Sequence, residues 1–138
     1  MDYCYLSKYV AGIYRRSKNE VNQRLGCLDL RATESDLLLF IDEHPQAKQQ
    51  EIAQEMMLDP SLLARDLKAL AQKKYIRRQC DGDDRRVKRI NLTKLGQKQV
   101  CQLRQMMNEW WVQFFAENDL DIEQFGAILQ QVYTKMLK

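Results

Sequence analysis

The feature that most constrains this chain is the stretch Asp59–Thr93, which reads DPSLLARDLKALAQKKYIRRQCDGDDRRVKRINLT. Its first third predicts an amphipathic helix, because Leu63, Leu67 and Leu70 recur at i, i+4 and i+7 and form one apolar stripe. A basic hairpin and the start of another helix follow. This order suits a module that reads DNA, since a helix fits the major groove and arginines at a hairpin tip reach the backbone and the minor groove.

The predicted helix has a defined start and a polar outer face. Asp59 or Ser61 can cap its N-terminus, with Pro60 in the first turn. The side chains expected to face outward are Ser61, Leu62, Arg65, Asp66, Lys68 and Ala69. Leu62 is apolar but lies off the main stripe, so two readings stay open: contact with a thymine methyl group in the groove, or a second-rank place in the core.

The hairpin consists of two strand-like runs, 75–80 and 87–92, joined by the turn sequence Asp81-Gly82-Asp83-Asp84. The residues expected to point inward are Ile76, Ile90 and Leu92. The ribbon carries the basic residues Arg77, Arg78, Lys88 and Arg89, with Arg85 and Arg86 beside the tip.

Positive charge is concentrated on this module. Residues 61–98 hold 12 lysines and arginines but 4 acidic residues, a balance of +8, whereas residues 1–60 and 99–138 have balances of −3 and −2. A merely solvated charged face is the usual explanation of a charge run, but it does not account for such a strong bias towards one sign. The module therefore predicts a nucleic-acid partner.

Short motifs lie in a fixed order around this module. Glu51-Ile52-Ala53 precedes the helix, Asp84-Arg85-Arg86 forms the hairpin tip, and Leu92-Thr93 with Gly96 follows it. In this order they resemble the MarR (multiple-antibiotic-resistance regulator) family of bacterial winged helix-turn-helix transcription factors, whose recognition-helix arginine falls on Arg65. The resemblance covers about residues 30–98 by motif and the remainder by helix pattern.

Two positions depart from the family pattern. Lys74 stands where many members have a glycine that ends the recognition helix, so Lys74 must either adopt the left-handed conformation or end the helix differently. Ala64 stands where many members carry threonine, which removes one candidate contact to phosphate or base. Neither departure changes the fold that the resemblance implies.

That fold class is mainly α (α+β): a winged helix-turn-helix with N- and C-terminal dimerisation helices, about six helices and a two- to three-stranded wing. At 138 residues the chain fits a single MarR-like domain, 1–138. We expect the winged helix-turn-helix DNA-binding part at 30–93 and the helical dimerisation part at 1–27 and 94–138.

Helix boundaries follow from periodicity and capping. The first helix is expected from residue 3 to about 25, where Gly26 ends it. A second helix stops at His44-Pro45, and Lys48–Met56 forms the first half of the helix-turn-helix. The caps expected for the second helix and the two C-terminal helices are Thr33, Thr93 and Asp121.

The first and last helices are rich in large apolar side chains. Two tryptophans and two phenylalanines lie within 110–115, which is more apolar area than a monomer of this size hides. We expect these helices to interlock with their copies in a symmetric dimer, the alternative being that they cover the winged domain's own core. The expected dimerisation residues are Leu6, Tyr9, Val10, Ile13, Trp110, Trp111, Phe114, Phe125, Leu129, Val132 and Tyr133.

The expected DNA contacts are Lys48, Gln49, Gln50, Ser61, Leu62, Arg65, Lys68, Lys73, Arg77, Arg85, Arg86 and Lys88. Most of the basic residues would neutralise phosphates, which gives affinity and salt dependence but little specificity. Arg65 and Ser61 are the candidates for base edges, and Arg86 for the minor groove. Asp84 would orient Arg86 through a charge-assisted bond.

The resemblance implies a homodimeric repressor that binds an inverted repeat in double-stranded DNA, often at its own promoter. It also implies release of DNA when a small apolar or phenolic molecule enters the cleft between the winged domain and the dimer helices. Tyr9, Ile13, Met107 and Trp111 are candidates to line such a cleft, although their helical spacing suits plain core equally well.

Other classes of function fit less well. The chain has one histidine, no glycine-rich phosphate loop and no nucleophile elbow, so we expect no enzyme, no cofactor and no metal. A protein-interaction module without DNA binding would not need arginines at the tip, and RNA binding usually shows exposed aromatics on a sheet. An oxidant-sensing regulator of the same fold stays an alternative, since the chain contains Cys4, Cys27, Cys80 and Cys101.

The N-terminus has neither the basic start nor the apolar centre of a signal peptide, and no apolar run approaches the roughly 18–20 residues of a membrane span. We therefore expect a cytoplasmic protein without a membrane partner, which associates with the nucleoid when bound to DNA. In that compartment the cysteines are expected to be reduced thiols.

Overall fold

The computed structural model describes residues 1–24, 28–82 and 84–137. Its elements are a short 3-10 helix η1 (Tyr3–Tyr5), α1 (Leu6–Arg24), α2 (Ala32–Glu43), β1 (Ala47–Lys48), α3 (Gln49–Glu55), α4 (Pro60–Gln72), β2 (Ile76–Asp81), β3 (Asp84–Leu92), α5 (Lys94–Glu117) and α6 (Ile122–Met136). Six α-helices and one three-stranded sheet in the described residues confirm the mainly helical winged helix-turn-helix fold.

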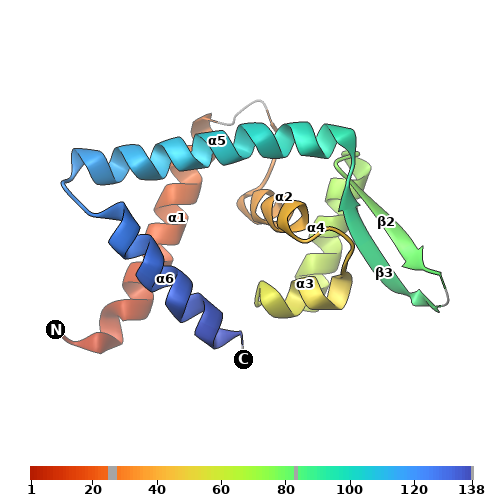
Figure 1. Cartoon of the computed structure of the whole chain (residues 1–138), viewed down its shortest axis with the longest axis horizontal. Helices are drawn as coiled ribbons and strands as arrows, with labels where there is room; N and C mark the ends of the chain where they lie inside the picture. Colours follow the sequence, from red (N-terminus) through yellow and green to blue (C-terminus); the bar gives the residue numbers. More distant parts are fainter. Residues whose placement is uncertain (25–27, 83, 138) are drawn as a thin grey trace.

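The long helix α5 joins two parts of the molecule (Figure 1). At one end of α5 lie α2, α3, α4 and the strands, and from its other half α1 and α6 extend to one side. We call the first part, residues 30–93, the winged part, and α1, α5 and α6 together the helical part. Gly26, expected to end the first helix, and Asp83 of the expected turn lie outside the described residues.

Side-chain caps set most of the helix starts. Asp59 accepts hydrogen bonds from two backbone N–H groups of α4, Thr93 accepts one from Gly96 at the start of α5, and Asp121 accepts one at the start of α6. These three expectations are confirmed. The expected Thr33 cap is wrong, because α2 begins at Ala32 and its N-cap is Arg31. The Glu34 carboxylate accepts the Arg31 backbone N–H at 3.1 Å, which fixes the earlier start.

The sheet has the strand order β1-β3-β2, and both pairings are antiparallel. In the wing hairpin Ile76 pairs with Leu92, and the register shifts between Cys80 and Asp81 near the tip. The two-residue strand β1, which pairs Ala47 with Ile90, was not predicted separately. It ties the chain just before α3 to the central strand of the wing.

The core of the winged part is closed. The stripe Leu63, Leu67 and Leu70 is fully buried against leucines of α2, and Ile76, Ile90 and Leu92 point inward as predicted. Asp66 was expected to face outward, but it is only 3% exposed. The expectation is wrong because Asp66 lies three residues after Leu63 and four before Leu70, on the same helix face as the stripe.

A close joint connects the end of α4 to the start of α5. Lys74 has φ 65°, so it adopts the left-handed conformation that a glycine usually supplies. Thr93 donates its hydroxyl to the Lys74 carbonyl at 2.7 Å and its N–H to the Tyr75 carbonyl at 3.0 Å. A Cβ at Gly96 would lie 2.1 Å from the Tyr75 carbonyl oxygen, so only glycine fits there.

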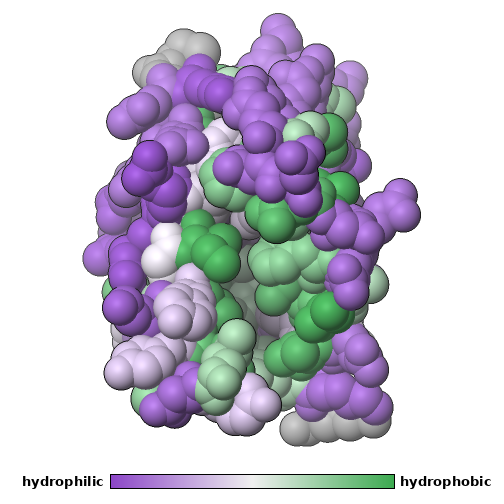
Figure 2. All heavy atoms as spheres, turned by 90° about the vertical axis from the view of Figure 1, so that its left-hand side faces the viewer, coloured by the Kyte–Doolittle hydropathy of each residue, from purple (hydrophilic) through white to green (hydrophobic). Residues whose placement is uncertain are grey.

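The helical part is covered far less completely. A small buried cluster joins Val21 of α1 and Leu28 to Leu103 and Trp110 of α5, but none of the residues of α6, all of which are described, is buried. Figure 2 shows apolar side chains gathered on this face between hydrophilic borders. The large apolar residues exposed on α1 and α6 include Leu6, Tyr9, Val10, Ile13, Leu129, Val132 and Tyr133.

No helix in the described part of the chain is long and apolar enough to cross a membrane.

Candidate nucleic-acid interface

Helices α3 and α4 form a tight helix-turn-helix. The turn between them passes through Met57, whose φ of 56° is left-handed, and the Leu58 N–H donates to the Ala53 carbonyl at 2.9 Å. The Asp59 carboxylate then accepts the N–H groups of Ser61 and Leu62, both at 3.1 Å. These bonds fix the first turn of α4 relative to α3, so the two helices can present their outer faces together.

The outer face of α4 is exposed and chemically mixed. It carries Ser61, Leu62, Arg65 and Lys68. Leu62 is 49% exposed, so the structure places it on the surface rather than in the core. The Arg65 Nε lies 3.6 Å from Oδ1 of buried Asp66, an oxygen that has no hydrogen-bond partner among the described residues. Asp66 therefore attracts and orients the guanidinium of Arg65, while more than half of the Arg65 side chain stays exposed.

The tip of the wing presents Arg86 in a fixed setting. Its side chain is 92% exposed, while Asp84 Oδ1 accepts its backbone N–H at 2.9 Å and its Nε at 3.2 Å. These bonds from Arg86 hold the pKa of Asp84 below its usual range, so the carboxylate stays charged at neutral pH. The predicted ion pair between Asp84 and Arg86 is thus present.

A second arginine braces the same hairpin. Arg89 donates to the Asp81 carboxylate at 3.3 Å and to the Gln46 carbonyl at 3.0 Å, and it lowers the pKa of Asp81. Arg89 therefore links the wing to the segment before β1. This role could not be predicted from the sequence, because Gln46 and Arg89 lie 43 positions apart.

A groove of about 810 Å³ runs between the start of α3, the start of α4 and β3. It is lined by Lys48, Gln49, Gln50, Ala53, Gln54, Pro60, Leu63, Asp84, Arg86, Val87 and Lys88. The groove brings together five of the expected DNA contacts from segments nearly 40 residues apart, together with the wing-orienting Asp84. Gln54 was not singled out from the sequence, although its place four residues after Gln50 puts it on the same face of α3.

Of the seven expected DNA contacts that do not line this groove, Lys73 and Arg77 have other surroundings. Lys73 forms an ion pair of 3.0 Å with fully buried Glu34 and donates to the Asp29 carbonyl at 2.6 Å. A buried carboxylate needs such a partner, so Lys73 is committed inside the molecule rather than to a phosphate. Arg77 lines a different hollow, beside Asp42 and Gln46.

Known proteins are similar to this chain in both sequence and fold. The family model described as MarR family matches residues 30–88. The chain is 36% identical over 104 residues to the HTH-type transcriptional regulator YxaD of Bacillus subtilis (strain 168). The aligned region covers 70% of this chain and 68% of YxaD. The chain belongs to the MarR family. It is therefore a transcriptional regulator of a DNA-binding family and not an enzyme.

Solved structures extend the likeness along nearly the whole MarR-family chain. The S. aureus MepR–DNA complex superposes with a TM-score of 0.77 at 26% identity and covers 99% of this chain and 97% of that one. A MarR variant from E. coli, complexed with operator DNA, has a TM-score of 0.78 at 22% identity, over 96% and 94% of the two chains. At that identity the second likeness shows the fold alone.

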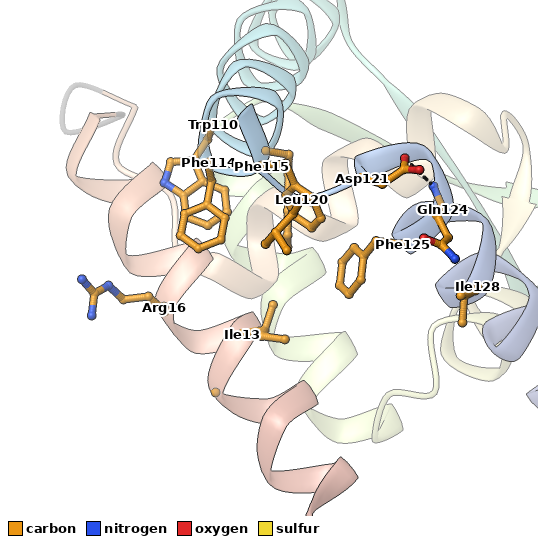
Figure 3. Close-up of a pocket in the computed structure, with 12 residues that line it drawn as sticks. Ile13, Arg16, Trp110, Phe114, Phe115, Leu120, Asp121, Gln124, Phe125 and Ile128 are labelled. Atoms are coloured by element: carbon orange, nitrogen blue, oxygen red, sulfur yellow. Dashed lines mark hydrogen bonds between the residues drawn. The ribbon is translucent and has the colours of Figure 1, made fainter. Parts of the chain in front are cut away.

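The helical part contains an apolar cavity of about 530 Å³ between α1, α5 and α6. Figure 3 shows Phe114, Phe115, Leu120 and Phe125 turned toward one space, with Ile13 facing them from α1. Of the four residues considered for a ligand cleft, Ile13 and Trp111 line this cavity, whereas Tyr9 and Met107 do not.

The expected dimerisation residues divide in the same way. Trp110 is only 6% exposed and donates its indole N–H to Glu20 at 2.7 Å, so it packs within its own chain. Trp111 and Phe125 are half-buried at the cavity, and the other members of the set are exposed. Trp110 was assigned to the dimer because of the apolar area gathered within 110–115, and that cluster gives no sign of its contact with Glu20, 90 positions away.

Three of the four cysteines lie within the described residues. No group of three or more histidine, cysteine or acidic residues suited to a metal occurs within the described residues. Cys4, Cys80 and Cys101 are exposed free thiols, and Cys27 lies outside the described residues. Asp2 raises the pKa of Cys4 by hydrogen bonding, which lowers the fraction of reactive thiolate.

Proposed function

We propose that this MarR-family protein is a sequence-specific repressor that binds an inverted repeat in double-stranded DNA as a homodimer. The groove that joins the start of α3 to the wing carries the proposal. It collects Lys48, Arg86 and Lys88 beside the exposed face of α4, which is the combination of backbone contacts and base readout that specific binding requires.

Each part of the surface has its own task in this proposal. Lys48, Gln49, Gln50, Lys68 and Lys88 bind phosphates and set the register of the protein on the duplex. Ser61, Leu62 and Arg65 enter the major groove and contact base edges. Arg86, held by Asp84 and flanked by Arg85, enters or borders the minor groove, whose negative potential attracts arginine.

The exposed apolar faces of α1 and α6 support the homodimer. Contiguous apolar surface of this kind on a protein marks an interaction site, and a two-fold dimer presents two recognition helices to one face of the duplex. In this proposal residues 30–93 bind DNA, while 1–27 and 94–138 form the dimer. Binding represses transcription by covering a promoter, so the protein acts in the cytoplasm on the nucleoid.

The apolar cavity supports the further step of relief by a small molecule. Its volume of about 530 Å³ falls in the range of pockets that hold drug-sized ligands, and its lining is almost entirely aromatic and aliphatic. A small apolar or phenolic molecule that binds there would press on α1, α5 and α6. It would thereby change the separation of the two recognition helices and release the DNA.

The test is the anisotropy of a labelled duplex from the region upstream of the protein's own coding sequence. Wild type and Arg86→Ala are titrated at two salt concentrations, with a scrambled duplex of the same composition alongside. We expect preference for the native duplex, steep weakening with salt, and loss of about tenfold or more in affinity for Arg86→Ala.

Two other outcomes carry different meanings. Equal, weak binding to both duplexes would show that this promoter is not the operator, and selection from random duplexes would then find the preferred site. Absence of binding to every duplex at low salt would refute DNA binding by the isolated protein and favour a protein-interaction module.

A further inference from the structure

The C-terminal end of α6 touches the helix-turn-helix at one point. The Tyr133 hydroxyl donates a hydrogen bond to the backbone carbonyl of Glu55, the last residue of α3. Figure 1 shows the same proximity, with the C-terminal end of α6 beside the C-terminal end of α3. Partial burial raises the pKa of Tyr133, and Glu55 adds to this effect, so the hydroxyl stays protonated and able to donate at neutral pH.

The end of α3 is also held from its other side. The Glu55 carboxylate lies 3.7 Å from Nε2 of His44, at the end of α2. The His44 ring stacks on Phe40, with ring centroids 4.0 Å apart, and its Nδ1 lies 3.0 Å from the Phe40 carbonyl oxygen. Glu55 therefore sits between the core of the winged part and the helical part.

The orientation of α3 determines that of α4. The Met56 N–H donates to the Ile52 carbonyl at 3.0 Å, the Leu58 N–H donates to Ala53, and Asp59 caps α4 directly afterwards. With the turn fixed in this way, a force on the end of α3 moves the recognition helix with it. The Tyr133 bond thus connects a helix of the helical part to the element that reads DNA.

We propose that Tyr133 is a positioning residue that sets the half-site spacing the dimer reads. The inference rests on the homodimeric function proposed above. In a dimer whose shared body contains α6, the bond from Tyr133 to α3 fixes the angle of each helix-turn-helix and so the separation of the two recognition helices. One base pair of added spacing moves a half-site by about 3.4 Å and turns it around the duplex by about 34–36°. A small change in the angle of the helix-turn-helix therefore changes the affinity for a given spacing.

Without the bond, the winged part is joined to the helical part mainly through α5 and the packing of α2 against α5 and α1. A long helix bends more readily than a structure braced at two points. Tyr133→Phe keeps the ring but removes the donor, so it should widen the range of spacings that the dimer accepts.

The experiment measures spacing preference with the full chain. The duplexes carry the preferred inverted repeat with the native spacer or with one base pair added or removed at its centre. The proteins are wild type, Tyr133→Phe, and Tyr3→Phe as the matched control on an exposed tyrosine of η1. Sedimentation at each protein concentration checks the dimer.

We expect wild type and Tyr3→Phe to prefer the native spacer strongly. In Tyr133→Phe the ratio of affinities for native and altered spacers should fall about fivefold, which is the scale of the net contribution of a single hydrogen bond. A merely structural loss would weaken all duplexes equally and leave this ratio unchanged.

The outcomes separate the two proposals. An unchanged ratio in Tyr133→Phe, or dimer dissociation in that variant, overturns the positioning role and leaves the repressor proposal intact. A wild type that binds DNA but shows no preference among spacers also overturns the positioning role, since there is then no spacing to set. A wild type that binds none of the duplexes refutes the proposed function, and this inference with it.

Discussion

The winged part and the helical part hide their apolar side chains to very different degrees. In the winged part, leucines from α2 and α4 such as Leu37, Leu38 and Leu67 are completely buried, and the sheet closes the core. In α6, fully described, no residue is buried, and Ile128, Leu129 and Val132 are exposed although the helix is strongly amphipathic. An amphipathic helix normally buries its apolar face. The winged part therefore buries its apolar face within one chain, whereas the apolar face of α6 stays uncovered.

The two parts also differ in what their surfaces offer to a partner. The winged part exposes cations and polar groups around a groove, and its acidic residues Asp81 and Asp84 are tied to arginines. The helical part exposes apolar area and an aromatic cavity. The same chain thus presents one surface suited to a polyanion and another suited to an apolar partner.

The largest expected effect is on the free energy of unfolding, when a buried leucine of the winged part and an exposed leucine of the helical part are each truncated. Leu67→Ala should lower the free energy of unfolding by about 2–5 kcal/mol, because it opens a cavity in a fully buried site. Leu129→Ala, at a site 42% exposed, should cost a monomer less than about 1 kcal/mol. Urea unfolding followed by circular dichroism at low protein concentration measures both, and equal losses would contradict the comparison.

The next prediction addresses the helical part alone. Leu129→Asp places a charge on the exposed apolar face of α6, and burying an unpaired charge in an interface is costly. The dissociation constant of the dimer should rise about 100-fold, while the unfolding of the winged part stays unchanged. Analytical ultracentrifugation measures the association, and Gln131→Asp on exposed α6 surface is the control. A wild-type monomer at all concentrations would refute the dimer.

The third prediction compares two arginines of the winged part. Arg86→Ala should reduce DNA affinity about tenfold or more, because Arg86 stands at the groove and is aimed by Asp84. Arg77→Ala removes the same charge from the hollow beside Asp42 and should cost clearly less. Duplex anisotropy at two salt concentrations measures both variants. A larger loss for Arg77→Ala would show that the DNA follows another face.

A smaller effect is expected from Leu62, the exposed apolar side chain at the start of α4. Replacing thymine by deoxyuridine, one position at a time, removes only the 5-methyl group. At one position per half-site this change should weaken wild type about fourfold, the worth of one buried methyl group. Leu62→Ala should not distinguish thymine from uracil there. Sensitivity that persists in Leu62→Ala would assign the methyl contact to another residue.

The smallest effect is expected at the junction of the two parts, at high pH. Tyr14 of α1 donates to Asp36 of α2 at 2.8 Å, and Lys18 bonds the same carboxylate. Burial, together with Asp36, raises the pKa of Tyr14 above its ordinary value of about 10. Its stabilising contribution is therefore complete below pH 10 and is lost as the pH rises through the raised value.

Tyr14→Phe should thus destabilise the protein by about 0.5 kcal/mol at pH 8, because the bond is partly exposed, and the difference should shrink above pH 10. Lys18 is present in both proteins, so the difference between their curves isolates the tyrosine. Urea unfolding at several pH values measures the curves. A constant difference across the series would show that Tyr14 acts through packing alone.

Contacts between residues that lie close together in the sequence were predicted well. The Asp84–Arg86 pair and the caps at Asp59, Thr93 and Asp121 all join residues within a few positions of one another, so spacing alone identifies them. The leucine stripe of α4 was equally local. The order of the wing motifs then carried the resemblance to the MarR family, and that resemblance implied the fold.

The misses come from contacts between distant segments. Lys73 was assigned to phosphate because nothing near it in sequence shows that Glu34, 39 positions away, is buried and needs a cation. Trp110 was expected in the dimer interface, although it packs against Glu20 of its own chain, 90 positions away. Asp66 is a different case, because its own spacing from Leu63 and Leu70 already placed it on the buried face of α4. A helical pattern gives the direction of a side chain relative to its own helix, but not which neighbouring helix covers it.

The placement of the aromatic residues has a practical consequence. Both tryptophans of the chain, Trp110 and Trp111, lie in the helical part, where their rings meet edge to face at the apolar cavity. The tryptophan emission of this protein, excited at a wavelength where tyrosine does not absorb, therefore reports on the helical part alone and is sensitive to association or to a quenching ligand in the cavity. Emission and circular dichroism should consequently yield two melting curves with different concentration dependence, from unlabelled protein in a single cuvette.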